Sequence, residues 1–128
     1  RLLLTFINYK INYLPMELHE RKCVACTPDT PPLKQKEINE YLKKVDGWQR
    51  KEGEEKIFKE YSFKKHRDAI EFTSIAGIIE EQEKHHAAVL RTFRKVKVTL
   101  STHAINGLSE NDFIMAAKFD EIYEKFGE

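Results

Sequence analysis

The sequence contains too little cysteine for a fold held together by disulfides. Its 128 residues include only two cysteines, Cys23 and Cys26, whereas small domains built on disulfides carry several pairs. A reducing compartment, the cytoplasm, is therefore the expected location. Glycine and proline are also sparse, with five and four residues, and no internal repeat or low-complexity segment is present.

Long apolar runs and an excess of one charge are absent as well. No run approaches the ~18 apolar residues that a membrane-spanning helix requires, so we expect no membrane insertion. The 22 basic and 21 acidic residues leave a net charge of +1, which argues against a protein that binds nucleic acid by neutralising phosphates. The same charge balance does not exclude binding to another protein. Hydrophobic residues make up 41% and charged residues 34% of the chain, an ordinary globular composition.

The length fits one domain with a modest core. The composition changes near Met16, because residues 1–15 are rich in Leu, Ile, Tyr and Asn without a clean period. We expect residues 1–15 to be an upstream extension outside the fold and no secretory signal; a helix packing on the domain is the alternative. Residues 16–33 are expected to form an arm with a Pro-rich linker, and residues 34–128 the folded domain.

Hydrophobic periodicity divides the folded domain into seven elements. The patterns predict helices over 34–45, 65–83 and 109–126, and strands over 48–51, 55–63, 87–92 and 94–102. The clearest strand alternates Val96, Val98 and Leu100 with polar residues. The order α-β-β-α-β-β-α predicts an α+β fold, in which three helices cover one face of a four-stranded antiparallel sheet. Such a small sheet leaves edges and apolar helix faces that oligomerisation usually covers.

Three of the five histidines lie where they can converge on one pocket. His85 and His86 stand at the junction between the long helix and a strand, a usual place for functional residues, although helix C-termini also suit cationic histidine. His103 closes the clearest strand, where a plain turn residue is the alternative. Imidazole transfers protons readily at neutral pH. From the residues alone, catalysis and a structural role both stay open.

Metal binding is not the favoured explanation of these residues. Adjacent histidines bind one ion less naturally than histidines two or four positions apart. Cys23-Val24-Ala25-Cys26 is half of a zinc site without a second pair, so we expect two free thiols on a flexible arm. His19 and His66 lie in polar surroundings, where we expect solvated surface residues.

Two further residues have a structural explanation beside a functional one. Asp112 follows Ser109 at the spacing of a capping box before an apolar run. Trp48 fits the core, a pocket wall or both. The residues themselves therefore indicate a small α+β domain with a three-histidine pocket, without naming a substrate.

A run of motifs spans residues 81–112. An acidic residue precedes a His-His pair, an aromatic residue and a Val-rich strand ending in Thr-His come next, and Gly-Leu and a helix-opening Asp follow. In this sequence they are Glu81, His85, His86, Phe93, the strand from Val96 to His103, Gly107, Leu108 and Asp112. This combination resembles the pterin-4a-carbinolamine dehydratase family, and the likeness covers roughly residues 16–126, including the Cys arm of bacterial members. Ala87 and Val89 depart from the family pattern, which usually has Pro, Cys or Ser and then Trp at these positions.

The resemblance implies a lyase that removes water from 4a-hydroxytetrahydropterin to give quinonoid dihydropterin, recycling the cofactor of aromatic amino acid hydroxylases. It implies no metal, no bound cofactor, a homodimer or homotetramer, and a functional link to such a hydroxylase. It assigns His85 and His103 to protonating the leaving hydroxyl, and His86 to binding the pterin and handling the N5 proton. The substrate-binding residues that it implies are Glu81, Trp48, Ser101, Thr102 and Asp112. Glu81 is expected to bind the amino-pyrimidine edge of the pterin or to tune the histidine pair, and Asp112 to orient a histidine while it caps its helix.

Two binding roles compete with this activity. Relatives of the family also act as dimerisation cofactors for a homeodomain transcription factor, and others are assembly chaperones for a carbon-fixing enzyme. The bacterial-type Cys arm disfavours the first role. The presence of His85, His86 and His103 together disfavours the second role, because the chaperones tend to lose the active-site pattern.

Overall fold

The computed structural model describes residues 16–51 and 53–127. The expected extension over residues 1–15 lies outside this described part. The elements, in chain order, are η1 (Leu18–Glu20), α2 (Gln35–Leu42), β1 (Gln49–Arg50), β2 (Ile57–Ser62), α3 (His66–Glu83), β3 (Ala88–Thr92), β4 (Lys95–Leu100), η2 (His103–Ile105) and α4 (Glu110–Glu124). Within these bounds, no helix is both long and apolar enough to cross a bilayer.

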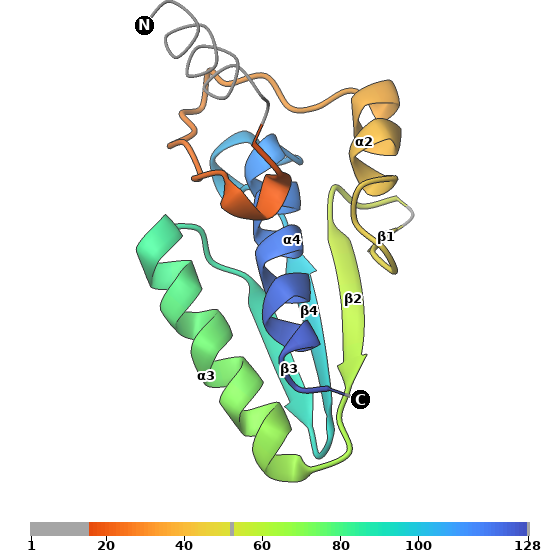
Figure 1. Ribbon diagram of the computed structural model, residues 1–128. Helices are drawn as coiled ribbons and strands as arrows, with labels where there is room; N and C mark the ends of the chain where they lie inside the picture. Colours follow the sequence, from red (N-terminus) through yellow and green to blue (C-terminus); the bar gives the residue numbers. More distant parts are fainter. Residues whose placement is uncertain (1–15, 52, 128) are drawn as a thin grey trace, which may run out of the picture.

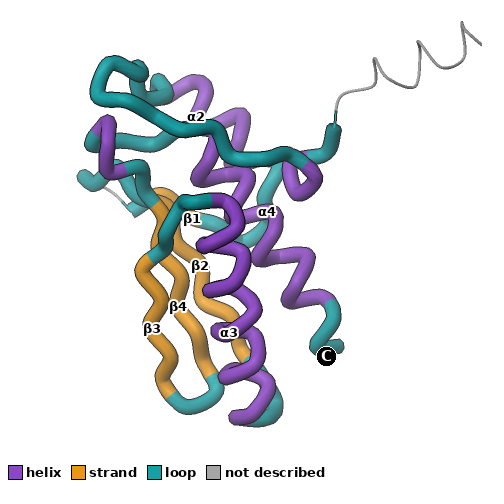
Figure 2. The backbone as a smooth tube through the Cα atoms, turned by 90° about the vertical axis from the view of Figure 1, so that its left-hand side faces the viewer, coloured by secondary structure: helices purple, strands orange, loops and turns teal. Residues whose placement is uncertain are grey.

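The strands form one four-stranded sheet in the order β1-β2-β4-β3, and each neighbouring pair is antiparallel. Helices α3 and α4 lie against the same face of this sheet (Figure 1), and the view from the side shows the strands and these helices as two layers (Figure 2). The α+β fold and its element order are thus confirmed. The boundaries differ mainly at the start, where the first helix ends at Leu42 and the first strand has only two residues.

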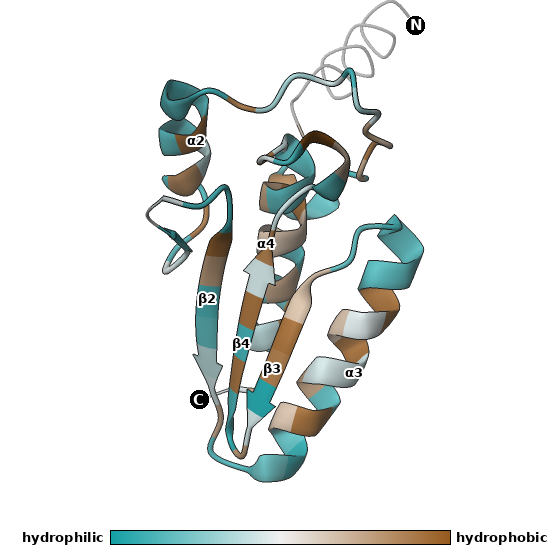
Figure 3. Ribbon diagram, turned by 180° about the vertical axis from the view of Figure 1, so that it is seen from behind, coloured by the Kyte–Doolittle hydropathy of each residue, from teal (hydrophilic) through white to brown (hydrophobic). Residues whose placement is uncertain are grey.

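Strand β4 shows how the sequence pattern produces the layers. Val96, Val98 and Leu100 are at most 1% exposed, because alternate side chains of a strand point to one face and this face is covered by helices. The residues between them are exposed or half-buried. Seen from behind, the opposite face of the sheet carries no helix (Figure 3). The buried face of the sheet therefore fixes the register of the strand.

Helix α4 is the central helix of the domain. Its fully buried side chains are Asp112, Phe113, Ile114, Met115, Ala116 and Phe119. Ser109 and Asp112 form the expected capping box at its start, which supplies partners for backbone amides that the helix itself leaves free. Asn111 and Asp112, in the first turn of α4, are 6% and 0% exposed, so this turn is held against the rest of the domain.

The arm before α2 packs against α4. Leu18 is buried at 7% exposure, the Arg21 guanidinium donates to Glu110 at 2.9 Å, and Lys118 donates to the His19 carbonyl at 2.9 Å. Figure 1 shows η1 beside α4. The arm is therefore attached to the domain through several contacts, in contrast to the flexible segment that the sequence indicated.

Asp120 of α4 organises a polar cluster at the side of the core. Its carboxylate accepts hydrogen bonds from Tyr61 at 2.6 Å, Lys59 at 2.8 Å and Trp48 at 3.1 Å. Burial and the Asp120 charge raise the pKa of Tyr61. Trp48 is only 5% exposed and packs edge-on against Tyr61, so its indole is a core group with a satisfied N–H.

Candidate active site

The junction between α3 and β3 turns sharply at Lys84. This residue ends α3 in the left-handed conformation, with φ 54° and ψ 38°, and its backbone N–H donates to Glu80. The next amide, of His85, donates to the same carbonyl at 3.1 Å. The Glu80 carboxylate then accepts from the Ala87 backbone at 2.9 Å. This irregular backbone directs two consecutive histidines to different partners.

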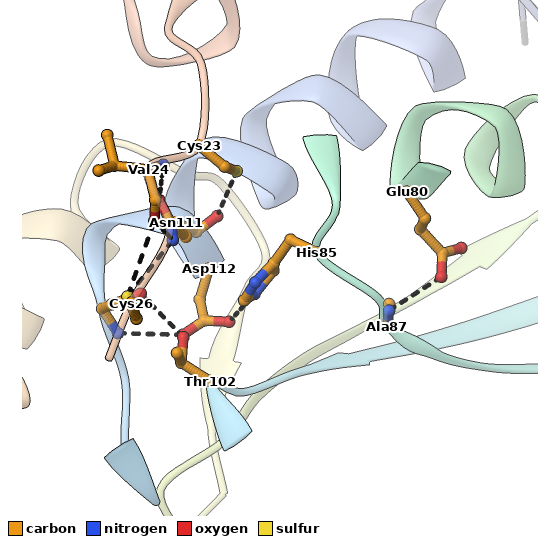
Figure 4. A network of polar contacts seen from close by, with 10 residues as sticks. Cys23, Val24, Cys26, Glu80, His85, Ala87, Thr102, Asn111 and Asp112 are labelled. Carbon is orange, nitrogen blue, oxygen red and sulfur yellow. Dashed lines mark hydrogen bonds and ion pairs between the residues drawn. The ribbon is translucent and has the colours of Figure 1, made fainter. Parts of the chain in front are cut away.

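His85 is held by a carboxylate of α4. Its Nε2 lies 2.7 Å from Asp112 Oδ1, and the side chains of His85 and Asp112 are 11% and 0% exposed. The other carboxylate oxygen accepts from Thr102 Oγ1 at 2.7 Å and from the Ser109 amide at 3.0 Å. Figure 4 shows this network between the end of α3, the end of β4 and the start of α4. A buried carboxylate with these partners fixes the orientation of the imidazole beside it.

His86 occupies a wetter environment. Its Nε2 lies 2.9 Å from Glu81 Oε1, and the two side chains are 66% and 80% exposed. Glu81 lies on the last turn of α3, so the pair spans the turn at Lys84. The two adjacent imidazoles thus differ in burial and in the carboxylate that each one meets.

The three histidines border a common cleft of about 320 Å³. His103 reaches it from the start of η2, directly after β4. The residues lining the cleft are Cys23, Val24, Ala25, Cys26, Glu83, Lys84, His85, His86, Ser101, Thr102, His103, Ala104 and Asn111. This volume is at the lower end of the ~300–1,000 Å³ range of small-molecule sites, so the cleft is large enough for a small ligand.

The other residues expected at the site lie at varying distances from this cleft. Ser101 and Thr102 line it, Asp112 lies directly behind His85, and Glu81 reaches it through its bond to His86. Trp48 is not a lining residue, because its indole is bound to Asp120 in the core. The sequence could not distinguish a core from a wall position for this tryptophan.

Neither remaining histidine belongs to the cleft. His19 pairs with Glu121 at 2.8 Å, and His66 Nε2 accepts from the Arg91 guanidinium at 2.9 Å at the far end of α3. Both are partly or largely exposed, in agreement with the expected surface positions.

Sequence reasoning missed the residues that close the cleft from the arm side. Asn111 binds Val24 by two hydrogen bonds, and Glu83 accepts from the Cys23 amide at 2.8 Å. No local pattern marks these contacts, because the paired residues are 60 and 87 positions apart. The one signal for a contact here is the polar capping-box turn at the start of an otherwise apolar helix.

Cys23 has the environment of a structural thiol. Burial and, to a smaller extent, the Glu83 charge raise its pKa to about 12, so the protonated form predominates at neutral pH. Among residues 16–51 and 53–127, no group of three or more His, Cys, Asp or Glu side chains is arranged to hold a metal ion.

Comparison with known proteins decides the family. The sequence model described as "Pterin 4 alpha carbinolamine dehydratase" matches residues 31–122. The chain belongs to the pterin-4a-carbinolamine dehydratase family. Proteins of this family from Alkaliphilus metalliredigens and Gloeobacter violaceus, provisionally named pterin-4-alpha-carbinolamine dehydratases, are 39% and 40% identical to it. These alignments cover 81% and 88% of this chain and 94% and 98% of the relatives.

A solved structure of the family has the same fold. The crystal structure titled as a transcriptional coactivator/pterin dehydratase from Brucella melitensis superimposes with a TM-score of 0.70 at 37% sequence identity. The match covers 72% of this chain and 98% of the Brucella chain. The resemblance inferred from the motifs is therefore confirmed as family membership, and the histidine cleft is the candidate dehydratase site.

Proposed function

We propose that this chain catalyses the dehydration of 4a-hydroxytetrahydropterin to quinonoid dihydropterin and water. The observation that supports this most is the bond between His85 and the fully buried Asp112, in a cleft that His86 and His103 also line. An imidazole oriented by a buried carboxylate is placed to pass a proton to a ligand in the cleft, and the neighbouring imidazoles are placed to take one up. Family membership adds the pterin as the substrate class.

The reaction requires one proton to be delivered and another to be removed. The C4a–O bond breaks as the N5 lone pair forms the C4a=N5 double bond, and the leaving oxygen takes a proton to depart as water. His85, with Asp112 holding its Nε2, is assigned to this proton delivery, together with His103. Neither step changes an oxidation state, so the protein has to supply proton transfer and no redox group.

His86 is assigned to the proton on N5. Its partner Glu81 is exposed and can favour the imidazolium that forms after the transfer. Glu81 can also accept from the amino-pyrimidine edge of the pterin. Ser101, which lines the cleft, offers backbone groups to the ring, whereas the backbone of Thr102 is already paired with Gly107.

The test is stopped-flow absorbance of enzymatically generated 4a-hydroxytetrahydropterin, comparing the wild type with His86→Ala and His103→Ala. We expect each variant to lose about 10²–10⁴-fold in rate, the usual contribution of a general acid or base. His66→Ala is the matched control, because this histidine contacts Arg91 away from the cleft. A wild type no faster than buffer refutes the enzymatic assignment and leaves a binding role on the same fold.

We also propose that the chain forms homodimers or homotetramers. β3 is an edge strand of the sheet, with Leu90 63% exposed, and α3 exposes Ile70 at 44% and Ile78 at 58%. Edge pairing through β3 and helix packing through α3 would cover these groups. Light scattering should show a dimer or larger at micromolar concentration, with Ile78→Lys losing the helix-mediated step; a monomer overturns this assignment.

A further inference from the structure

The segment Cys23-Val24-Ala25-Cys26, here called the thiol arm, forms one side of the histidine cleft. All four of its residues line the cleft together with His85, His86 and His103. About half of the chain separates it from these histidines, so its place beside them depends on tertiary contacts. The proton-transfer chemistry makes no use of this segment.

Asn111 holds the thiol arm through its side-chain amide. Its Oδ1 accepts from the Val24 amide at 2.9 Å, and its Nδ2 donates to the Val24 carbonyl at 2.6 Å. The same Nδ2 lies 3.6 Å from Cys26 Sγ. Asn111 is 6% exposed, and it precedes Asp112 on the first turn of α4. The amide imitates a neighbouring strand, since it satisfies both backbone groups of one residue (Figure 4).

The two thiols of the arm have different environments. Cys23 is fixed at both ends, because its amide donates to Glu83 at 2.8 Å and its Sγ lies 3.8 Å from the Asn111 carbonyl. It packs against the hydrophobic core. Cys26 Sγ contacts the Val24 carbonyl at 3.8 Å and the Asn111 amide, and it remains half-exposed beside the cleft. Both thiols are half-buried and line the cleft, but Cys23 also packs on the core and anchors the arm, which leaves Cys26 as the thiol that faces a ligand without this structural role.

We propose that the thiol arm is a substrate-contacting wall of the cleft, with Cys26 as a specificity-determining residue and Asn111 as the positioning residue that holds the wall in place. This inference rests on the proposed function, because it assigns the wall to the pterin. A thiol flanked by Ala25 presents a small, polarizable and mostly apolar surface, which suits the flat face of a heteroaromatic ring. The histidines supply the proton chemistry from another side of the cleft.

Thiol labelling tests the wall without relying on turnover. In the Cys23→Ser chain only Cys26 reacts with iodoacetamide, and its rate is measured with and without 7,8-dihydrobiopterin, a pterin that lacks the 4a hydroxyl. We expect saturating pterin to slow labelling of Cys26 about tenfold, as for a group covered by a ligand. Binding of the pterin is measured separately by equilibrium dialysis. Bound pterin without protection of Cys26 overturns the wall, whereas no bound pterin overturns the proposed function and the wall with it.

Release of the arm tests the role of Asn111. In the Cys26→Ser chain only Cys23 reacts, and Asn111→Ala should raise its labelling rate about tenfold or more by fully exposing a thiol that is now half-buried. Asn39→Ala is the matched control, because Asn39 is exposed on α2, away from the arm, and accepts from Gln35. Asn111→Asp, which keeps the acceptor for Val24 but loses the donor, should give an intermediate rate. Circular dichroism confirms that each variant is folded.

Kinetics distinguish a positioning role from general damage. Asn111→Ala should raise KM about tenfold while kcat changes little, because a displaced wall weakens substrate and transition-state binding alike. Unchanged labelling of Cys23 together with an unchanged KM in the folded variant overturns the role of Asn111.

Discussion

Asp112→Asn separates the charge of the buried carboxylate from its shape. The amide oxygen can take the place of Oδ2 and still accept from Thr102 and the Ser109 amide. The amide nitrogen then faces His85 Nε2. In the wild type this position is occupied by Asp112 Oδ1, which lies 2.7 Å from Nε2 and shares its hydrogen. His85 must now be an acceptor at Nε2, so the substitution fixes it as a neutral imidazole.

The expected cost to stability is moderate. Hydrogen bonds to a charged acceptor contribute about 1.5–3 kcal/mol, against about 0.5–1.5 kcal/mol for neutral partners. Weakening the bonds from Thr102 and Ser109 by about 1 kcal/mol each gives a loss of roughly 2 kcal/mol. Domains of this kind are stable by about 5–15 kcal/mol, so we expect the variant to fold. Urea unfolding measures the loss.

The expected cost to catalysis is larger. Without a carboxylate beside it, His85 loses the acceptor that orients its ring in the cleft, and the rate should fall by about 10²–10⁴-fold. Stopped-flow absorbance measures this loss, and Ser109→Ala is the control, because it weakens the cap by about 1 kcal/mol and leaves the His85–Asp112 contact in place. A folded Asp112→Asn protein with the wild-type rate refutes proton delivery by His85.

Three predictions concern the stability of the fold. Asp120→Ala should cost about 3 kcal/mol in urea unfolding, since it leaves the Tyr61 hydroxyl and the Trp48 N–H without their acceptor, with no loss of dehydration rate. Gly107→Ala should cost about 1–3 kcal/mol by overpacking, because the added Cβ would lie 2.8 Å from the Pro32 side chain; an unchanged urea midpoint contradicts this. Stability should also fall as the pH rises above about 9, because Cys23, with a pKa of about 12, and Tyr61, whose pKa is raised, release protons later in the folded than in the unfolded chain. Urea midpoints at pH 8, 9 and 10 measure this slope, which Tyr61→Phe should reduce.

The sequence predicted those parts of the fold whose signals are local. The alternation around Val98 and the capping box at Ser109 each depend on residues within a few positions, so β4 and α4 could be placed closely. The first strand was overestimated, because the apolar Trp48 before β1 turns into the core to meet Asp120. A strand pattern does not distinguish such a residue from one that continues the ladder.

The candidate site was predictable in its histidines and less so in their partners. The motif named His85 and Asp112 and implied that Asp112 orients a histidine, but not which one, since the contact joins residues 27 positions apart. The attached arm was missed for the same reason, because Cys23 and Asn111 carry no periodic signal. Contacts between residues this far apart in the sequence depend on how the helices pack, and a single sequence does not reveal that packing.

Asn111 and Asp112 are consecutive residues, yet one holds the arm and the other holds His85. Both side chains therefore move with one turn of backbone. A substitution deep in α4 that shifted this turn by a fraction of an ångström would alter ligand fit and proton delivery together, in a fixed proportion. Variants selected for tighter binding through the packing of α4 should consequently show a correlated change in rate. Changes within the arm itself should alter binding without a linked change in the rate of proton delivery.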